Sequence, residues 1–199
     1  MPVPIMEASR CPHLVVARPL AVVRLLECMS SSAPIVIMGV SGSGKTTVGV
    51  LLATRLGWRF VDGDDLHSPQ NVAKMAAGTA LNDADRASWL GKVSAVLSEG
   101  EVVVACSALR RRYRDRLRHA APALRLVYLQ GSRALLGART QARRHPFMPP
   151  ELLESQLSTL EQPQADEQAI IMSIEQMPSA IVDRVVALID PGTASLYQA

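Results

Sequence analysis

From Pro34 onward, short apolar, β-branched runs alternate with stretches in which apolar residues recur at helical spacing. Strands buried on both faces read as continuous apolar runs, and covering helices show an apolar stripe. The alternation predicts an α/β fold, a three-layer sandwich around a five-stranded parallel sheet. Gly57 and Gly100 suit the C-caps of the first two helices. The expected strands are 35–40, 59–64, 101–108, 124–131 and 169–175, with helices near 45–56, 85–98, 109–119, 132–143, 149–160 and 178–190.

Residues 1–33 differ from the rest of the chain. They contain four prolines and a serine run at 30–32, and Arg18 and Arg24 break their apolar patches, which excludes a secretory signal. We expect an N-terminal extension that is disordered or reflects a start assigned too early; a transit peptide is the alternative. Residues 34–199 are expected to form one domain.

Length and composition fit a single soluble α/β domain of 199 residues. No uninterrupted apolar run approaches the ~20 residues of a membrane span, so we expect a cytoplasmic protein without a membrane partner. Cys11, Cys28 and Cys106 are odd in number and form no C-x-x-C pair, which argues against a disulfide framework or a zinc site. Cys106 is interpreted as a buried strand residue.

The segment 39–46, GVSGSGKT, fits the Walker A pattern of a glycine, four residues, Gly-Lys and Ser or Thr. It lies between a buried strand and an amphipathic helix, as the pattern requires. Backbone amides, the helix N-terminus and Lys45 would converge on phosphate oxygens, and Thr46 would hold Mg²⁺. The expected nucleotide-binding residues here are Gly39, Val40, Ser41, Gly42, Ser43, Gly44, Lys45, Thr46 and Thr47.

Small-molecule kinases, regulatory GTPases and mechanical ATPases all use this loop. The guanine-reading N-K-x-D tetrapeptide is absent, and the chain is short for most motor ATPases. The sequence therefore favours a kinase.

Asp62-Gly63-Asp64-Asp65 ends the second expected strand, at the sheet edge where ligands bind in such folds. Phosphoryl transfer needs one carboxylate for Mg²⁺ and one that orients the acceptor hydroxyl and takes its proton. In an extended chain Asp62 and Asp64 share one side, and Gly63 would allow close approach. The alternative is an acidic turn in which Asp64 or Asp65 caps a helix.

Further candidates are polar residues near the same edge. Arg86 can clamp a carboxylate or phosphate, although a cap by Asp83 with a surface ion pair accounts for the pattern as well. Ser107, at the end of the third expected strand, and Arg110, just after it, are expected to face the crevice. The arginine-rich run 110–118 indicates nucleic acid or a phosphorylated ligand, but its residues cannot all point one way, so most are expected to be solvated.

A second basic group, Arg139, Arg143, Arg144 and His145, precedes a proline-rich segment. Small kinases use mobile lids to bring arginines over the transferring phosphate and exclude water, and these residues fit such a lid. The alternative is a basic helix end that interacts with its own dipole.

Several segments together resemble the bacterial-type gluconokinases, a family of P-loop small-molecule kinases. The resemblance covers nearly all of 34–163, in the right order and spacing. It departs at the lid, where Arg143 matches the family and His145 is displaced by one place. The matching segments are GVSGSGKTT, DGDDLHSPQNVAKMAAG, LNDADRASWL, CSALRRRYRDRLR, LVYLQGS and FMPPELLESQLSTLEQP.

The resemblance implies a nucleoside-monophosphate-kinase-like fold, usually homodimeric. It also implies transfer from ATP to the 6-hydroxyl of D-gluconate, giving 6-phosphogluconate for the pentose phosphate or Entner–Doudoroff route. On this basis Lys45, Asp64 and Arg143 would be catalytic and Arg139 would help to bind the nucleotide. Mg²⁺ would lie on Thr46 and Asp62, and the substrate would be read by Asp64, His67, Arg86, Ser107 and Arg110.

Two rivals remain. Shikimate kinases and adenylylsulfate kinases share the core and differ in the acceptor. A P-loop protein that binds nucleic acid through 110–118 would belong to another class. Nucleic-acid bases stack on aromatic side chains, and Tyr113 is the one aromatic residue among those arginines, so no nucleic-acid partner is expected.

Overall fold

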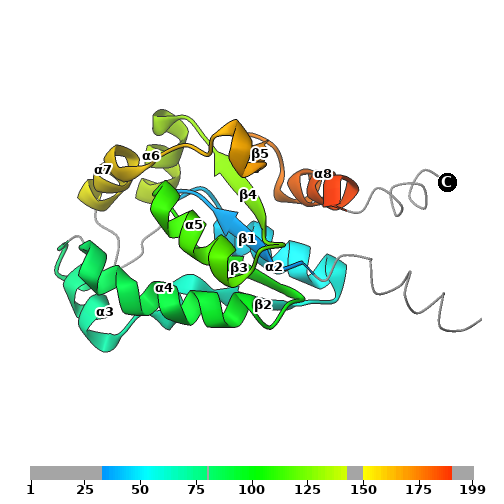
Figure 1. Ribbon diagram of the computed structural model, residues 1–199. Coiled ribbons are helices and arrows are strands. Elements are labelled where there is room, and N and C mark those ends of the chain that lie inside the picture. Colours follow the sequence, from blue (N-terminus) through cyan, green and yellow to red (C-terminus); the bar gives the residue numbers. More distant parts are fainter. Residues whose placement is uncertain (1–32, 80, 143–149, 190–199) are drawn as a thin grey trace, which may run out of the picture. The chain divides into compact units, whose positions relative to one another are not determined.

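The apolar runs form a five-stranded sheet in the order β2-β3-β1-β4-β5, and every neighbouring pair is parallel. A computed structural model of the chain describes residues 33–79, 81–142 and 150–189. All of them lie in one unit of the chain, Ser31–Ala199. The predicted α/β fold with a five-stranded parallel sheet is confirmed (Figure 1). The strands are β1 (Ile35–Met38), β2 (Arg59–Asp62), β3 (Val102–Ala105), β4 (Arg125–Gln130) and β5 (Ile170–Ser173).

Each strand is shorter than its apolar run predicts because the chain turns into a site loop or a helix at the carboxyl end. β2, for example, ends at Asp62, and Gly63–Leu66 form the 3₁₀ turn η1. A second 3₁₀ turn, η2, covers Ala165–Glu167. The helices are α2 (Lys45–Leu56), α3 (Pro69–Ala76), α4 (Asp83–Leu97), α5 (Arg111–Ala120), α6 (Arg133–Ala142), α7 (Pro150–Thr159) and α8 (Pro178–Ile189).

The helix ends show which sequence signals were decisive. Gly57 is the C-cap of α2 in the left-handed conformation, as predicted. The expectation for Gly100 is wrong, because Ser98 is the C-cap of α4. α4 begins two residues before its predicted start, because Asn82 and Asp85 form a capping box.

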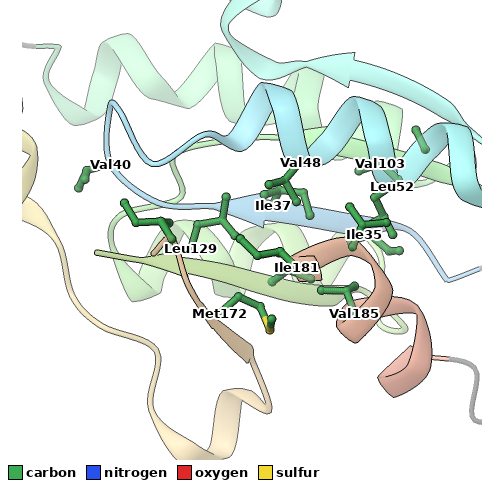
Figure 2. Packing of buried hydrophobic residues seen from close by; sticks show 14 of the residues in the cluster. Ile35, Ile37, Val40, Val48, Leu52, Val103, Leu129, Met172, Ile181 and Val185 are labelled. Atoms are coloured by element: carbon green, nitrogen blue, oxygen red, sulfur yellow. The ribbon is translucent and has the colours of Figure 1, made fainter. Parts of the chain in front are cut away.

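Alternate strand residues pack on opposite faces of the sheet, as strand geometry requires. Ile35 and Ile37 of β1 belong to the core shared with α2 and α8, whereas Val36 and Met38 belong to the core shared with α4 and α5. Figure 2 shows the first core, in which Val48 and Leu52 of α2 and Ile181 and Val185 of α8 meet the strands. The two cores fix the sheet between two helical layers.

Cys106 is fully buried directly after β3, so its predicted burial is confirmed, and burial raises the pKa of its thiol to about 12. In the described part of the chain, no helix combines the length and apolarity needed to cross a membrane.

Candidate active site

The Walker A segment forms a tight loop between β1 and α2. Gly39, Gly42 and Gly44 all have positive φ, which glycine alone adopts at little cost. A Cβ at Gly42 would lie 2.8 Å from Thr140 Oγ1, so α6 packs directly against the loop. Gly44 caps α2 without a side-chain hydrogen bond, which leaves the amides of the first turn available to a phosphate.

Lys45 and Thr46 lie where the loop enters α2. The Lys45 ammonium donates a hydrogen bond to Val40 O at 3.2 Å, which holds it against the loop. The Thr46 hydroxyl donates to Asp62 Oδ2 at 2.8 Å, although the two residues lie on different elements. The structure thus joins the predicted Mg²⁺ ligands, Thr46 and Asp62, and their hard oxygens are the ligand type that Mg²⁺ takes beside substrate phosphates. Among the described residues no cluster of three or more His, Cys, Asp or Glu could hold a metal.

Asp64 lies in η1, not in an extended strand, so the predicted extended pairing of Asp62 and Asp64 is wrong. The two residues still meet, because Asp62 is the N-cap of η1 and its Oδ1 accepts a hydrogen bond from Asp64 N at 3.1 Å. The predicted close approach at Gly63 is present: a Cβ there would lie 2.5 Å from Ala105 O. Trp89 Nε1 also donates to Gly63 O at 2.6 Å, which fixes the turn.

A cavity, called here the acceptor-side cavity, lies beside this turn, between α3, α4 and α7. His67 stacks on Trp89 with ring centroids 4.6 Å apart, and Arg86 lines the same cavity. Burial lowers the pKa of His67 below its usual value, against the opposing effect of Asp64. The imidazole is therefore neutral near pH 7, and within the described residues its buried Nδ1 has no hydrogen-bond partner.

Arg86 is held by the cavity wall, since its Nη1 donates to Leu81 O and its guanidinium carbon lies 5.9 Å from the centre of the Tyr113 ring. The cap of α4 is Asn82, not Asp83 as the alternative proposed. Predicted substrate-reading residues His67 and Arg86 are thus brought to one cavity.

Ser107 and Arg110 have different surroundings. Ser107 O accepts a hydrogen bond from Gly39 N at 3.4 Å, so Ser107 borders the phosphate loop. Arg110 lies 3.9 Å from Asp83, which also binds Arg112 and the Tyr113 hydroxyl. The structure does not place Arg110 among the described residues that line this cavity, or among those that line a larger cavity beside the phosphate loop.

The arginine-rich run serves mainly to hold the fold. Arg114 is 1% exposed and makes a bidentate pair with the buried Glu167, through Nε at 2.5 Å and Nη2 at 2.8 Å. Its Nη1 donates to the carbonyls of Ala108, Leu109 and Glu161. Arg111 binds Asp166 in the same region. These pairings leave few arginines of the run for a ligand.

The larger cavity, of about 280 Å³, adjoins the phosphate loop. Thr47 and Arg139, both predicted to bind nucleotide, line it, and Arg139 Nη2 donates to Ile174 O at 2.7 Å. The remaining wall comes from the segment after β5 and from α8, through Ile174, Gln176, Pro178 and Ile181. Arg143, Arg144 and His145 lie outside the described residues.

Sequence reasoning from the residues missed α7 as part of the site. Ser155, Gln156 and Thr159 line the acceptor-side cavity with His67 and Arg86. Their spacing places them on one side of a helix, and the S-Q dipeptide at 155–156 was the available signal.

Comparison with known proteins agrees with this geometry. The shikimate kinase family model matches residues 41–190. Gluconokinase from Gluconobacter oxydans (strain 621H) is 46% identical over 157 residues, which is 76% of this chain and 88% of that protein. The thermosensitive gluconokinase of Escherichia coli (strain K12) is 43% identical, over 68% of this chain and 75% of its own.

A solved structure extends the agreement to three dimensions. The crystal structure of a gluconokinase from Sinorhizobium meliloti 1021 superposes with a TM-score of 0.75 at 42% identity, and covers 83% of this chain and 96% of that chain. The chain therefore belongs to the shikimate kinase family of P-loop phosphotransferases and, within it, to the gluconokinases.

Proposed function

We propose that this enzyme transfers the γ-phosphoryl group of ATP to the 6-hydroxyl of D-gluconate, giving 6-phospho-D-gluconate and ADP. The observation that carries the proposal is the junction between the two halves of the site. Thr46 of the phosphate loop is bonded to Asp62, and Asp62 in turn fixes Asp64 beside the His67–Arg86 cavity. The relatives at 43–46% identity are named gluconokinases.

On the donor side, Lys45 and the loop amides would hold the β- and γ-phosphates, and Thr47 and Arg139 would border the nucleoside. Mg²⁺ bound between Thr46, Asp62 and the phosphates would neutralise charge on the transferring group. Arg143 would add a second positive charge there.

On the acceptor side, Asp64 is exposed, and its backbone carbonyl accepts a hydrogen bond from the amide of His67, which lines the cavity. Among the described residues Asp64 makes no ion pair like those that occupy Asp83 and Asp85. Its carboxylate would accept the proton of the 6-hydroxyl as the oxygen attacks phosphorus. Arg86 would supply the cation that the gluconate carboxylate needs, and neutral His67 and Ser107 would contact hydroxyl groups. Arg110 would also contact the substrate if its guanidinium moved away from Asp83, from which it lies 3.9 Å.

Purified protein incubated with Mg²⁺-ATP and gluconate tests the proposal directly. We expect stoichiometric ADP and 6-phosphogluconate, with the phosphate located by NMR. Shikimate and adenylylsulfate serve as alternative acceptors for the two rival kinases. Turnover of shikimate without turnover of gluconate would overturn the assignment.

We further propose that the protein acts in the cytoplasm as a homodimer and feeds gluconate into the pentose phosphate or Entner–Doudoroff route. Residues 34–199 would form the kinase domain and residues 1–33 an extension. Light scattering on the full chain gives the oligomeric state.

A further inference from the structure

One side chain of α7 touches both halves of the site. Gln156 Oε1 accepts a hydrogen bond of 2.6 Å from Ser41 N, in the middle of the phosphate loop. The same residue lines the acceptor-side cavity that contains His67 and Arg86. Ser41 and Gln156 are 115 positions apart in the chain, so the contact is tertiary.

The chemistry of this hydrogen bond fixes the orientation of the Gln156 carboxamide. A backbone N–H can only donate, so the atom facing Ser41 must be the carbonyl oxygen, Oε1. The amino group, Nε2, then carries two N–H donors on the other side. Of the described residues, none accepts a hydrogen bond from Nε2.

The end of α7 is held firmly enough to make this placement specific. Glu161 N donates to Leu109 O at 2.8 Å, and Arg114 Nη1 donates to Glu161 O at 3.0 Å. Arg111 N also donates to Glu161 Oε2 at 2.7 Å. These bonds tie the chain after α7 to the loop after β3, so Gln156 is supported by the fold and does not rely on its own side chain for position.

We propose that Gln156 is a specificity-determining residue for the acceptor, in which Oε1 holds the Ser41 amide and Nε2 donates to a hydroxyl oxygen of the sugar acid. The inference rests on the proposed gluconate kinase function. A bound acceptor that covers Nε2 but lacks that hydroxyl would leave these donors buried without a partner, which is how polar groups in a site discriminate between substrates. Because one carboxamide contacts both the phosphate loop and the acceptor, it fixes the position of the acceptor relative to the phosphate loop.

The test is Gln156→Met, which keeps the side-chain length and removes both polar atoms. Gln162→Met is the matched control, since Gln162 is exposed and its side chain makes no hydrogen bond to a described residue. Initial rates are measured with gluconate and with gluconates that each lack one of the 2-, 3-, 4- or 5-hydroxyls. Binding of Mg²⁺-ADP is measured by calorimetry.

For Gln156→Met we expect kcat/KM for gluconate to fall about 10- to 100-fold. One deoxy analogue should be a poor substrate for the wild-type enzyme and should suffer no further loss in the variant. For each of the other analogues, the fold loss in kcat/KM caused by the missing hydroxyl and the fold loss caused by the mutation should multiply. The control should behave as the wild type, and ADP affinity should change little in either variant.

Gln156→Glu separates the two atoms of the carboxamide, and it also serves if the Met variant does not fold. The carboxylate of Glu still accepts from Ser41 N but cannot donate. In this variant, kcat/KM for the same deoxy analogue should therefore equal kcat/KM for gluconate. Equal selectivity across all analogues in the wild-type enzyme and both variants overturns the role of Gln156 alone. Absence of gluconate turnover by the wild-type enzyme overturns the proposed function and this inference with it.

Discussion

The carboxylate of Asp62 uses its two oxygens for different tasks. Oδ2 accepts from the Thr46 hydroxyl and Oδ1 from the amide of Asp64, at 2.8 and 3.1 Å. One short side chain thus aligns the expected Mg²⁺ site with the expected general base. At the residue scale, placement of the base depends on the turn that Asp62 caps, and that turn requires Gly63.

Asp64→Asn tests the base. We expect kcat to fall about 10²- to 10⁴-fold, because an amide cannot accept the hydroxyl proton, while the dissociation constant for Mg²⁺-ADP changes little. Asp65→Asn is the matched control, since Asp65 is the exposed neighbour in the same turn. Comparable losses in both variants would point to net charge and not to proton transfer.

Gly63→Ala tests the close approach of η1 to β3. The added methyl would lie 2.5 Å from Ala105 O, so we expect a loss of about 1–3 kcal/mol in the free energy of unfolding. Gly137→Ala is the control, because Gly137 is inside α6 and a Cβ there would meet no other part of the described chain within 4 Å. For Gly137→Ala we expect the free energy of unfolding to rise by about 0.5–1 kcal/mol, because Ala favours a helix over Gly. Urea denaturation measures both; a neutral Gly63→Ala would show that the turn can shift.

At the scale of elements, α5 and the segment after α7 form one polar joint around Arg114. The guanidinium binds Glu167 on one side and the carbonyls of Ala108, Leu109 and Glu161 on the other. The joint therefore holds the loop after β3 and the end of α7 together, and both border the site.

Arg114→Met should destabilise the protein by about 3–5 kcal/mol, because it leaves the Glu167 carboxylate buried with Arg118 as its remaining charged partner. Arg116→Met, on the exposed side of the same helix, should stay within about 0.5 kcal/mol of the wild type. Chemical denaturation measures both free energies. Equal effects would mean that the joint contributes nothing to stability beyond general surface charge.

The elements also show what sequence can and cannot predict. All five strands were found because fully buried parallel strands are unbroken apolar runs. α3 was missed because it is only eight residues long and is held by polar contacts that no apolar pattern predicts: its buried residue is Asn71, whose Nδ2 donates to Asp85 O, and Lys74 pairs with Asp85. The phosphate loop could be predicted because all of its glycines and its lysine lie within eight consecutive residues, 39–46. Gln156 was not, because its contact with Ser41 exists only after folding.

At the scale of the whole molecule, two titratable residues, His67 and Glu167, make the free energy of unfolding depend on pH. Burial lowers the pKa of His67 below 6.5. For Glu167, burial opposes but the hydrogen bond from Arg114 and further interactions lower the pKa below 4.5. In both cases the unfolded chain takes up a proton first as the pH falls, so the folded state loses stability.

We therefore expect two steps of acid destabilisation, one that begins below about pH 6.5 and one that begins below about pH 4.5. His67→Phe keeps a ring against Trp89 and removes the titrating group, so it should abolish the first step and leave the second. The free energy of unfolding measured between pH 3 and pH 8 checks both. Persistence of the first step in His67→Phe would assign it to another group.

The strand order has a consequence for how the chain is made. β1 lies in the middle of the sheet, yet its partners β3 and β4 are both synthesised much later, since Ile35 pairs with Val103 and Arg125. Until those segments emerge, the most apolar strand of the protein has two open edges, and open strand edges invite pairing with other chains. Parallel pairings of this range also form slowly. The newly made chain is thus most exposed to aggregation before β4 is complete, and overexpression at lower temperature or with chaperones should raise the soluble yield.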